Sequence, residues 1–209
     1  MPLNIKYSLK LERQRVNKTI KKLPWYGKLG YSPRFPENIN PKIDSLKKIH
    51  AALLDEYNEI DYKKAAMEIN KKFSAIEKNF SSNLQKICGK KIRKNFQLIL
   101  TKYGVGGSYS SPDKIIYNIG MKSSSINTIF HEITHLVIEP NIKKYQIQQN
   151  EKERIVDLIL TSKPIALTDY KMQKRGKDCG KIIDPLFKKY FKPPINNFFK
   201  KLTELRYKI

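Results

Sequence analysis

Three residues in the middle of the chain have the types and spacing of a metal site. His131 and His135 enclose Glu132 in a His-Glu-x-x-His motif. The run from about Ser124 to Glu139 is predicted to be a helix, which would place the two histidines one turn apart on one face. Two imidazole nitrogens so placed can bind a single Zn²⁺ at about 2.0–2.1 Å. The carboxylate of Glu132 would then lie beside the metal, where it could accept a proton from a water molecule that the metal activates.

The residues around the motif favour a packed helix over a surface helix with two unrelated histidines. Four apolar residues at helical spacing form a stripe beside the histidines, namely Ile126, Phe130, Ile133 and Val137. Such a helix would be buried on one side and would present its polar flank to a cavity. Pro140 is predicted to end it.

A catalytic zinc usually has three protein ligands and one open position, so a third ligand is expected. The remaining histidine, His50, lies far upstream on a predicted helix, where a lone histidine is more often a surface or core residue. Glu153 and Asp157 lie at i and i+4 in a second predicted helix and share a face. Glu153 could complete the zinc site, and Asp157 could accept the second N–H of a ligating histidine.

Two other carboxylates compete with Glu153 as the third ligand. Glu151 has no acidic residue four positions later, and ordinary acidity in the first turn of a helix accounts for it. Glu139 stands directly before Pro140, where the predicted helix ends. Glu153 is therefore favoured because Asp157 could orient a histidine ligand beside it.

The His-Glu-x-x-His motif, seventeen intervening residues and then Glu153-x-x-x-Asp157 resemble the signature of the gluzincin metallopeptidases, the thermolysin-like group. The resemblance covers about residues 128–159. It implies a zincin-like α+β core, one Zn²⁺ per chain and the hydrolysis of peptide bonds in a peptide or protein substrate. It also implies that the two histidines and Glu153 bind the zinc, that Glu132 is the general base, and that Asp157 orients a ligand.

The same resemblance implies groups that stabilise the developing oxyanion. Thermolysin-like enzymes place a tyrosine between the two helices, and Tyr145 occupies a comparable position here. The downstream histidine of the family has no counterpart, because no histidine follows His135. Tyr170 and Tyr190 are further candidates, which position in the sequence cannot rank.

A glycine-rich segment precedes the motif and is our candidate for the substrate-binding strand. The runs 96–100 and 114–119 are rich in strand-forming residues and flank the segment 104–110. Zincins present an antiparallel edge strand before the active-site helix, along which an extended peptide can pair. Glycines there would allow close backbone approach, although a plain hairpin loop is an equal alternative. The candidate substrate-binding residues are Gly106, Gly107, Ser108 and Tyr109.

The composition shows a strong excess of positive charge. The 209 residues include 42 Lys and Arg against 19 Asp and Glu, a formal net charge of +23. A basic surface can bind polyanions by releasing counterions from phosphates. The charges are scattered, however, and abundant lysine with Asn and Ile is also typical of AT-rich genomes. The alternative function is therefore a basic nucleic-acid-binding protein with a structural or vestigial metal site.

We expect an extended basic N-terminal arm over residues 1–40 and a single zincin-like catalytic domain over 41–209. Within that domain, 41–90 is predicted to be helical, 91–165 to hold the sheet and the active-site helices, and 166–209 to be helical again.

The chain has the features expected of a protein in the cytoplasm. It has no run of 18 apolar residues, and its first residues lack the apolar core of a signal peptide. Cys88 and Cys179 are too few for a disulfide framework, so both are expected to be thiols.

Overall fold

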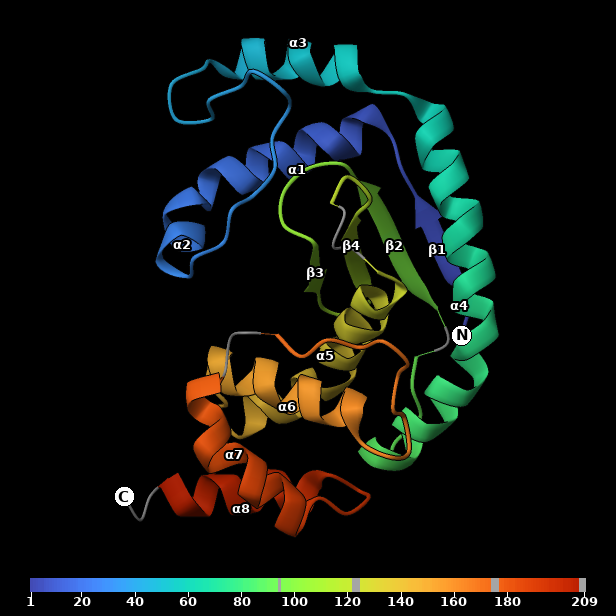
Figure 1. The fold of residues 1–209 in the computed structure, drawn as a ribbon, viewed down its shortest axis with the longest axis vertical. Helices are drawn as coiled ribbons and strands as arrows, with labels where there is room; N and C mark the ends of the chain where they lie inside the picture. The colour runs from blue at the N-terminus through green and yellow to red at the C-terminus, as the bar shows by residue number, and fades with distance from the viewer. Residues whose placement is uncertain (94, 122–124, 174–176, 207–209) are drawn as a thin grey trace. The chain divides into compact units, whose positions relative to one another are not determined.

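The structure is a computed structural model that describes residues 1–93, 95–121, 125–173 and 177–206 (Figure 1). Within that part of the chain it has an α+β fold with a four-stranded mixed sheet and eight helices. The elements are, in order, β1 (Leu3–Lys6), α1 (Leu9–Lys21), α2 (Leu23–Lys28), α3 (Leu46–Glu56), α4 (Glu59–Cys88), β2 (Phe96–Thr101), β3 (Gly107–Ser110), β4 (Lys114–Asn118), α5 (Ile126–Lys144), α6 (Gln149–Thr161), α7 (Lys177–Tyr190) and α8 (Asn196–Arg206). The predicted start of the motif helix at Ser124 lies outside the described residues.

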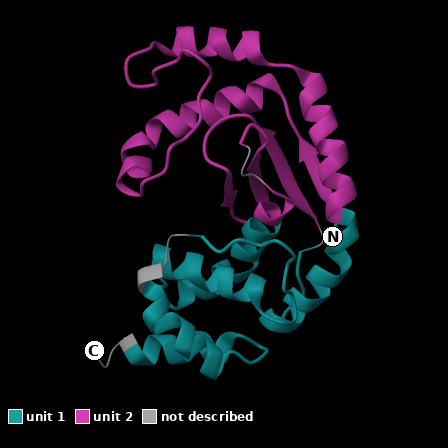
Figure 2. Cartoon of the chain, in the orientation of Figure 1, with its two compact units in different colours: residues 1, 74–94, 130–209 teal, residues 2–73, 95–129 magenta. Residues whose placement is uncertain are grey.

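The chain divides into two compact units (Figure 2). Unit 1 consists of Met1, Ser74–Lys94 and Phe130–Ile209, and unit 2 consists of Pro2–Phe73 and Asn95–Ile129. Helices α4 and α5 contribute residues to both units.

Unit 2 contains the sheet, whose strand order is β1-β2-β4-β3 (Figure 1). The two pairs β1–β2 and β2–β4 are parallel, while β3 is an edge strand antiparallel to β4. Leu98, Leu100 and Ile115 are fully buried, as expected for strands that pack against helices. The antiparallel edge strand predicted within residues 104–110 is therefore present as β3.

The first forty residues are not the irregular arm that the sequence predicted. Strand β1 pairs with β2 from Leu3↔Phe96 onward, and α1 and α2 follow it. Helix α1 begins at Ser8, whose side chain accepts a hydrogen bond from the backbone N–H of Leu11, and its Val16 is fully buried with Ile49. The glycines and prolines that suggested an arm begin only at Pro24, after α1 has ended.

A buried carboxylate links three elements of unit 2. Glu12 of α1 accepts hydrogen bonds from the hydroxyls of Tyr62 and Thr101 and from the backbone N–H of Lys102. Burial raises the pKa of Glu12 above its ordinary value despite these hydrogen bonds. This group therefore has a structural role, since hydrogen bonds from α4 and β2 compensate its burial.

Unit 1 contains most of α5 and all of α6, α7 and α8. Every residue from 129 to 138 of α5 is buried, so this segment is buried on all sides and not along one stripe as predicted. The helix also continues through Pro140 to Lys144, although the proline was predicted to end it. An internal proline costs about 3 kcal/mol, which burial of the following Ile142 helps to offset.

The later helices of unit 1 are fixed to one another by specific contacts. Helix α6 begins with a capping box between Gln148 and Glu151. Arg154 of α6 donates a hydrogen bond of 2.7 Å from its Nε to Asp184 of α7. Phe198 of α8 is fully buried, and its ring packs edge-on against Phe187 of α7. Within the described residues, no helix is long and apolar enough to cross a membrane.

Candidate metal centre

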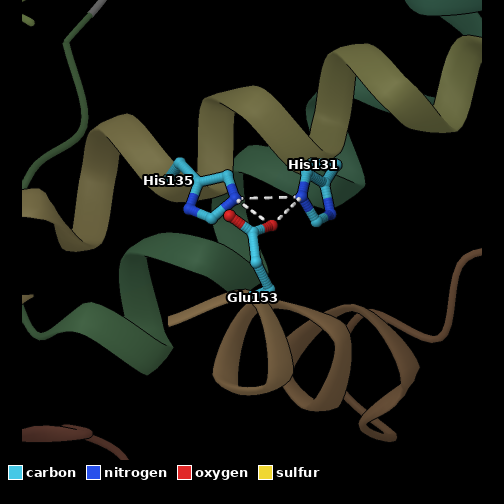
Figure 3. A group of neighbouring side chains, drawn as sticks. All are labelled: His131, His135 and Glu153. Atoms are coloured by element: carbon cyan, nitrogen blue, oxygen red, sulfur yellow. Dashed lines mark hydrogen bonds and ion pairs between the residues drawn. The ribbon is translucent and has the colours of Figure 1, made fainter. Parts of the chain in front are cut away.

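Side chains of α5 and α6 converge on one point inside unit 1. His131 and His135 project from α5 and Glu153 projects from α6, with their nitrogen and oxygen atoms turned toward one another (Figure 3). The Nε2 atoms of the two histidines are 2.9 Å apart. Oε2 of Glu153 lies 3.2 Å from Nε2 of His131 and 3.1 Å from Nε2 of His135. All three residues are buried.

These three donors fit a zinc ion in both chemistry and spacing. Tetrahedral zinc with bonds of about 2.0–2.1 Å separates neighbouring ligand atoms by about 3.3 Å. The observed separations of 2.9–3.2 Å are slightly shorter than this value. Two imidazoles and one carboxylate are also the ligand set of a catalytic zinc with an open position. The helical spacing in the sequence correctly predicted this group.

The pKa shifts of the three side chains favour a neutral His135 and an ionised Glu153. Burial lowers the pKa of His135 to about 4. Burial alone would raise the pKa of Glu153, but His135 and His131 together hold it well below its ordinary value. Burial also acts to lower the pKa of His131, yet the carboxylates of Glu153, Glu132 and Asp157 outweigh it and raise this pKa. His131 is therefore the ligand at which a proton competes most strongly with a metal.

A tyrosine hydroxyl connects His131 to Asp157. The hydroxyl of Tyr170 donates to Oδ1 of Asp157 at 2.5 Å and lies 2.7 Å from Nδ1 of His131. Because its single proton goes to the carboxylate, the hydroxyl must accept a hydrogen bond from Nδ1–H. His131 is thereby fixed in the tautomer whose Nε2 carries the lone pair that a metal needs.

This contact corrects one expectation about Asp157. The sequence predicted that Asp157 accepts a histidine N–H directly, but its Oδ1 is 3.8 Å from Nδ1 of His131, which is too far for a hydrogen bond. The carboxylate is fully buried and acts on the histidine through Tyr170. Burial raises the pKa of Tyr170, and the charge of Asp157 raises it further, so the hydroxyl keeps its proton.

Known proteins add no description of this site. No family model, curated protein or solved structure matches the chain. The case for a metal site therefore rests on the chemistry and spacing of the side chains of His131, His135 and Glu153, which could hold a metal ion.

Two glutamines contact residues of the cluster, and the sequence predicted neither. Gln149 donates from Nε2 to Oε1 of Glu153 at 2.7 Å, which leaves Oε2 directed at the histidines. Gln173 lies on the segment after α6, and its side-chain nitrogen is 3.0 Å from Nε2 of His131. Its backbone N–H donates to Oδ2 of Asp157 at 2.8 Å. The four-residue spacing on a helix could have predicted the contact between Gln149 and Glu153. No periodic pattern in the sequence predicts the contact of Gln173.

Glu132 is buried next to the cluster. It directly follows His131 in α5, and its charge contributes to the raised pKa values of both His131 and Tyr170. A buried carboxylate next to a ligand in the sequence is the kind of group that can exchange protons with a molecule bound at a metal.

Other residues considered in the sequence make contacts outside the cluster. The ring of Tyr145, predicted to stabilise an oxyanion, stacks on that of Phe199 of α8, with centroids 5.8 Å apart. The competing ligands are engaged in helix contacts, Glu151 in the capping box of α6 and Glu139 in an ion pair with Lys143. His50 lies in unit 2, where its Nε2 is 2.9 Å from the side-chain oxygen of Asn17.

The candidate substrate-binding residues belong to unit 2. Gly107, Ser108 and Tyr109 are in edge strand β3, where they pair with Tyr117, Ile116 and Ile115 of β4. Gly106 directly precedes β3, and its carbonyl accepts a hydrogen bond of 2.8 Å from the backbone N–H of Asn118. One edge of β3 is thus paired to β4, as the peptide-binding hypothesis requires.

Proposed function

We propose that this protein is a zinc-dependent metallopeptidase of the gluzincin type with a zincin-like core. The observation that carries the proposal is the buried group of His131, His135 and Glu153 at the separations of ligands on one metal. Glu132 lies beside this group, and the hydrogen bonds around His131 orient its metal-binding nitrogen. Zinc metallopeptidases use two histidines and a glutamate as zinc ligands, with the glutamate of the motif as general base.

In this proposal the residues of the chain position the reactants and transfer the protons. A bound zinc would acidify a water molecule and polarise the carbonyl of the scissile bond. Glu132 accepts the proton of the attacking water and then passes it to the leaving amine. Tyr170 does not serve as the oxyanion donor, because its proton is committed to Asp157.

The test is peptide cleavage by zinc-loaded protein, measured with a library of quenched fluorescent peptides. Wild type should cleave a subset of the library, and Glu132→Gln should lower kcat by about 10²–10⁴-fold while binding one zinc per chain. Loss of activity with retained metal is expected because glutamine keeps the shape of the side chain but cannot accept the proton. Normal cleavage by zinc-loaded Glu132→Gln would refute the mechanism.

A second candidate function follows from the net charge of +23. A nucleic-acid-binding protein of this charge would bind labelled DNA or RNA with an affinity that falls steeply as salt is raised. Tight binding near physiological salt, together with no peptide cleavage by zinc-loaded wild type, would favour this function and leave the metal a structural role.

A further inference from the structure

The segment after α6 brings a side-chain amide to the metal-binding face of His131. Nε2 of Gln173 is 3.0 Å from Nε2 of His131, the same ring nitrogen that faces His135 and Glu153. This nitrogen carries the lone pair, because Nδ1 donates its proton to Tyr170. The amide N–H of Gln173 therefore donates to the atom that would bind the metal.

The separation is that expected between two ligands of one metal. Neighbouring ligand atoms on tetrahedral zinc are about 3.3 Å apart. The other contacts of the same His131 nitrogen, to His135 and Glu153, are 2.9 Å and 3.2 Å. A half-turn of the terminal torsion of Gln173 exchanges its amide nitrogen for its oxygen, which is a suitable ligand atom.

The position of Gln173 is fixed from its own backbone. Its backbone N–H donates to Oδ2 of Asp157 at 2.8 Å, while the other oxygen of the same carboxylate accepts from Tyr170. The carboxylate that orients His131 through Tyr170 thus also holds the backbone from which Gln173 reaches the metal-binding nitrogen. Little further ordering is needed to keep the amide there.

The contact of the amide with the metal-binding nitrogen of His131 differs from the placement of an oxyanion donor. An oxyanion donor lies about 2.7–3.1 Å from the oxyanion, outside the ring of metal ligands. Gln173 instead lies 3.0 Å from the nitrogen of His131 that would bind the metal, a separation that fits a ligand of the same metal. A primary amide has the same functional groups as a peptide bond, so it can fill a ligand position as a substrate would.

We infer that Gln173 is the fourth protein ligand of the resting metal centre, a displaceable one that substrate must replace. The inference rests on the metal site of the proposed function but not on peptide hydrolysis. A neutral amide is a weak ligand compared with imidazole or carboxylate, so a peptide carbonyl or a small anion can displace it. If Gln173 occupies the position about 90% of the time, an external ligand binds about tenfold more weakly than to an open site.

The test is azide binding to the Co²⁺-loaded protein, followed by visible absorption, with three variants compared with wild type. Gln173→Ala should bind azide about tenfold more tightly and should show a changed spectrum before azide is added. Gln173→Glu places an anionic oxygen in the same position and should bind azide more weakly than wild type. Lys171→Ala, an exposed change on the same segment, is the matched control and should behave as wild type.

Each outcome decides the inference. Equal azide affinity in wild type, Gln173→Ala and Gln173→Glu would exclude Gln173 from the metal centre. Should Gln173→Ala fail to fold, weaker azide binding by Gln173→Glu supports the inference and unchanged binding refutes it. Failure of wild type to take up Co²⁺ would refute both this inference and the metal site. The predicted azide pattern without cleavage of any peptide by wild type or Gln173→Ala would leave Gln173 as a ligand and overturn only the peptidase function.

Discussion

The hydroxyl of Tyr170 donates a hydrogen bond of 2.5 Å to the buried carboxylate of Asp157. The donation leaves only a lone pair of the hydroxyl for His131, so the state of one tyrosine proton determines which nitrogen of the histidine can bind a metal. The orientation of His131 thus depends on Tyr170, a residue that lies outside both α5 and α6.

Removing this hydroxyl should weaken metal binding without abolishing it. Tyr170→Phe leaves His131 without its hydrogen-bond acceptor, and we expect a loss of about 10–100-fold in zinc affinity. Competition with a chromophoric chelator measures the change. Tyr145→Phe is the matched control, because Tyr145 stacks on Phe199 and should leave zinc affinity unchanged. Equal affinities for both variants would show that the hydroxyl of Tyr170 does not orient the ligand.

Glu153 and Glu151 provide a direct test of the third ligand, since they lie two residues apart on the same helix. Glu153→Ala should lose most of the bound zinc, because it removes the only oxygen assigned to the three-residue cluster. Glu151→Ala should keep one zinc per chain and lose about 1 kcal/mol of stability with its capping box. Metal content by mass spectrometry, with thermal unfolding alongside, distinguishes the two. The reverse pattern would assign the ligand to Glu151.

Zinc affinity should depend on pH through His131 first. The pKa of His131 is raised above its ordinary value of 6.5, so below that raised pKa the metal must displace one proton. The pKa of His135 is about 4, so this residue stays neutral until much lower pH. Affinity should therefore fall about tenfold per pH unit as pH drops below the pKa of His131, and more steeply only near pH 4. A chelator-competition series from pH 8 to about 4 checks the slope. Release of two protons for each zinc bound near pH 6 would show that both histidines are protonated there, and would contradict the low pKa of His135.

Removing the metal should destabilise the protein. A ligand that binds only the folded chain stabilises it by about 4 kcal/mol at a free concentration of about 1,000 times its Kd. We expect a rise of several degrees in the midpoint of thermal unfolding on adding zinc to metal-free wild type. Glu132→Gln should show the same rise because it retains the three ligands, whereas His135→Ala should show none. A rise of equal size in His135→Ala would place the metal elsewhere.

The sequence predicted the grouping of His131, His135 and Glu153 because all three lie on regular helices. The period of α5 fixes the relation between His131 and His135, and the four-residue spacing of Glu153 and Asp157 identified the face of α6 that meets them. Strands β2 and β4 were predicted from runs of strand-forming residues on either side of a glycine-rich segment. The edge strand β3 and the α+β core were expected from the resemblance to gluzincins.

The rest of the site lies on irregular backbone, where no period relates sequence to position. Tyr170 and Gln173 follow α6 on a segment whose described residues, 162–173, form no helix or strand. Tyr170 was among the candidate tyrosines, but only the folded structure shows that it, and not Tyr145, is hydrogen-bonded to His131 and Asp157. The predicted end of α5 at Pro140 was wrong for a different reason, because tertiary packing of Ile142 outweighed a local preference.

The chain positions of the cluster residues have a consequence for the entropic cost of folding. His131 and Gln173 are 42 positions apart in the chain, whereas Leu3 of β1 and its partner Phe96 of β2 are 93 positions apart. Short loops close faster and at lower entropic cost than long ones. Bringing the residues of the metal cluster together therefore costs less chain entropy than adding β1 to the sheet.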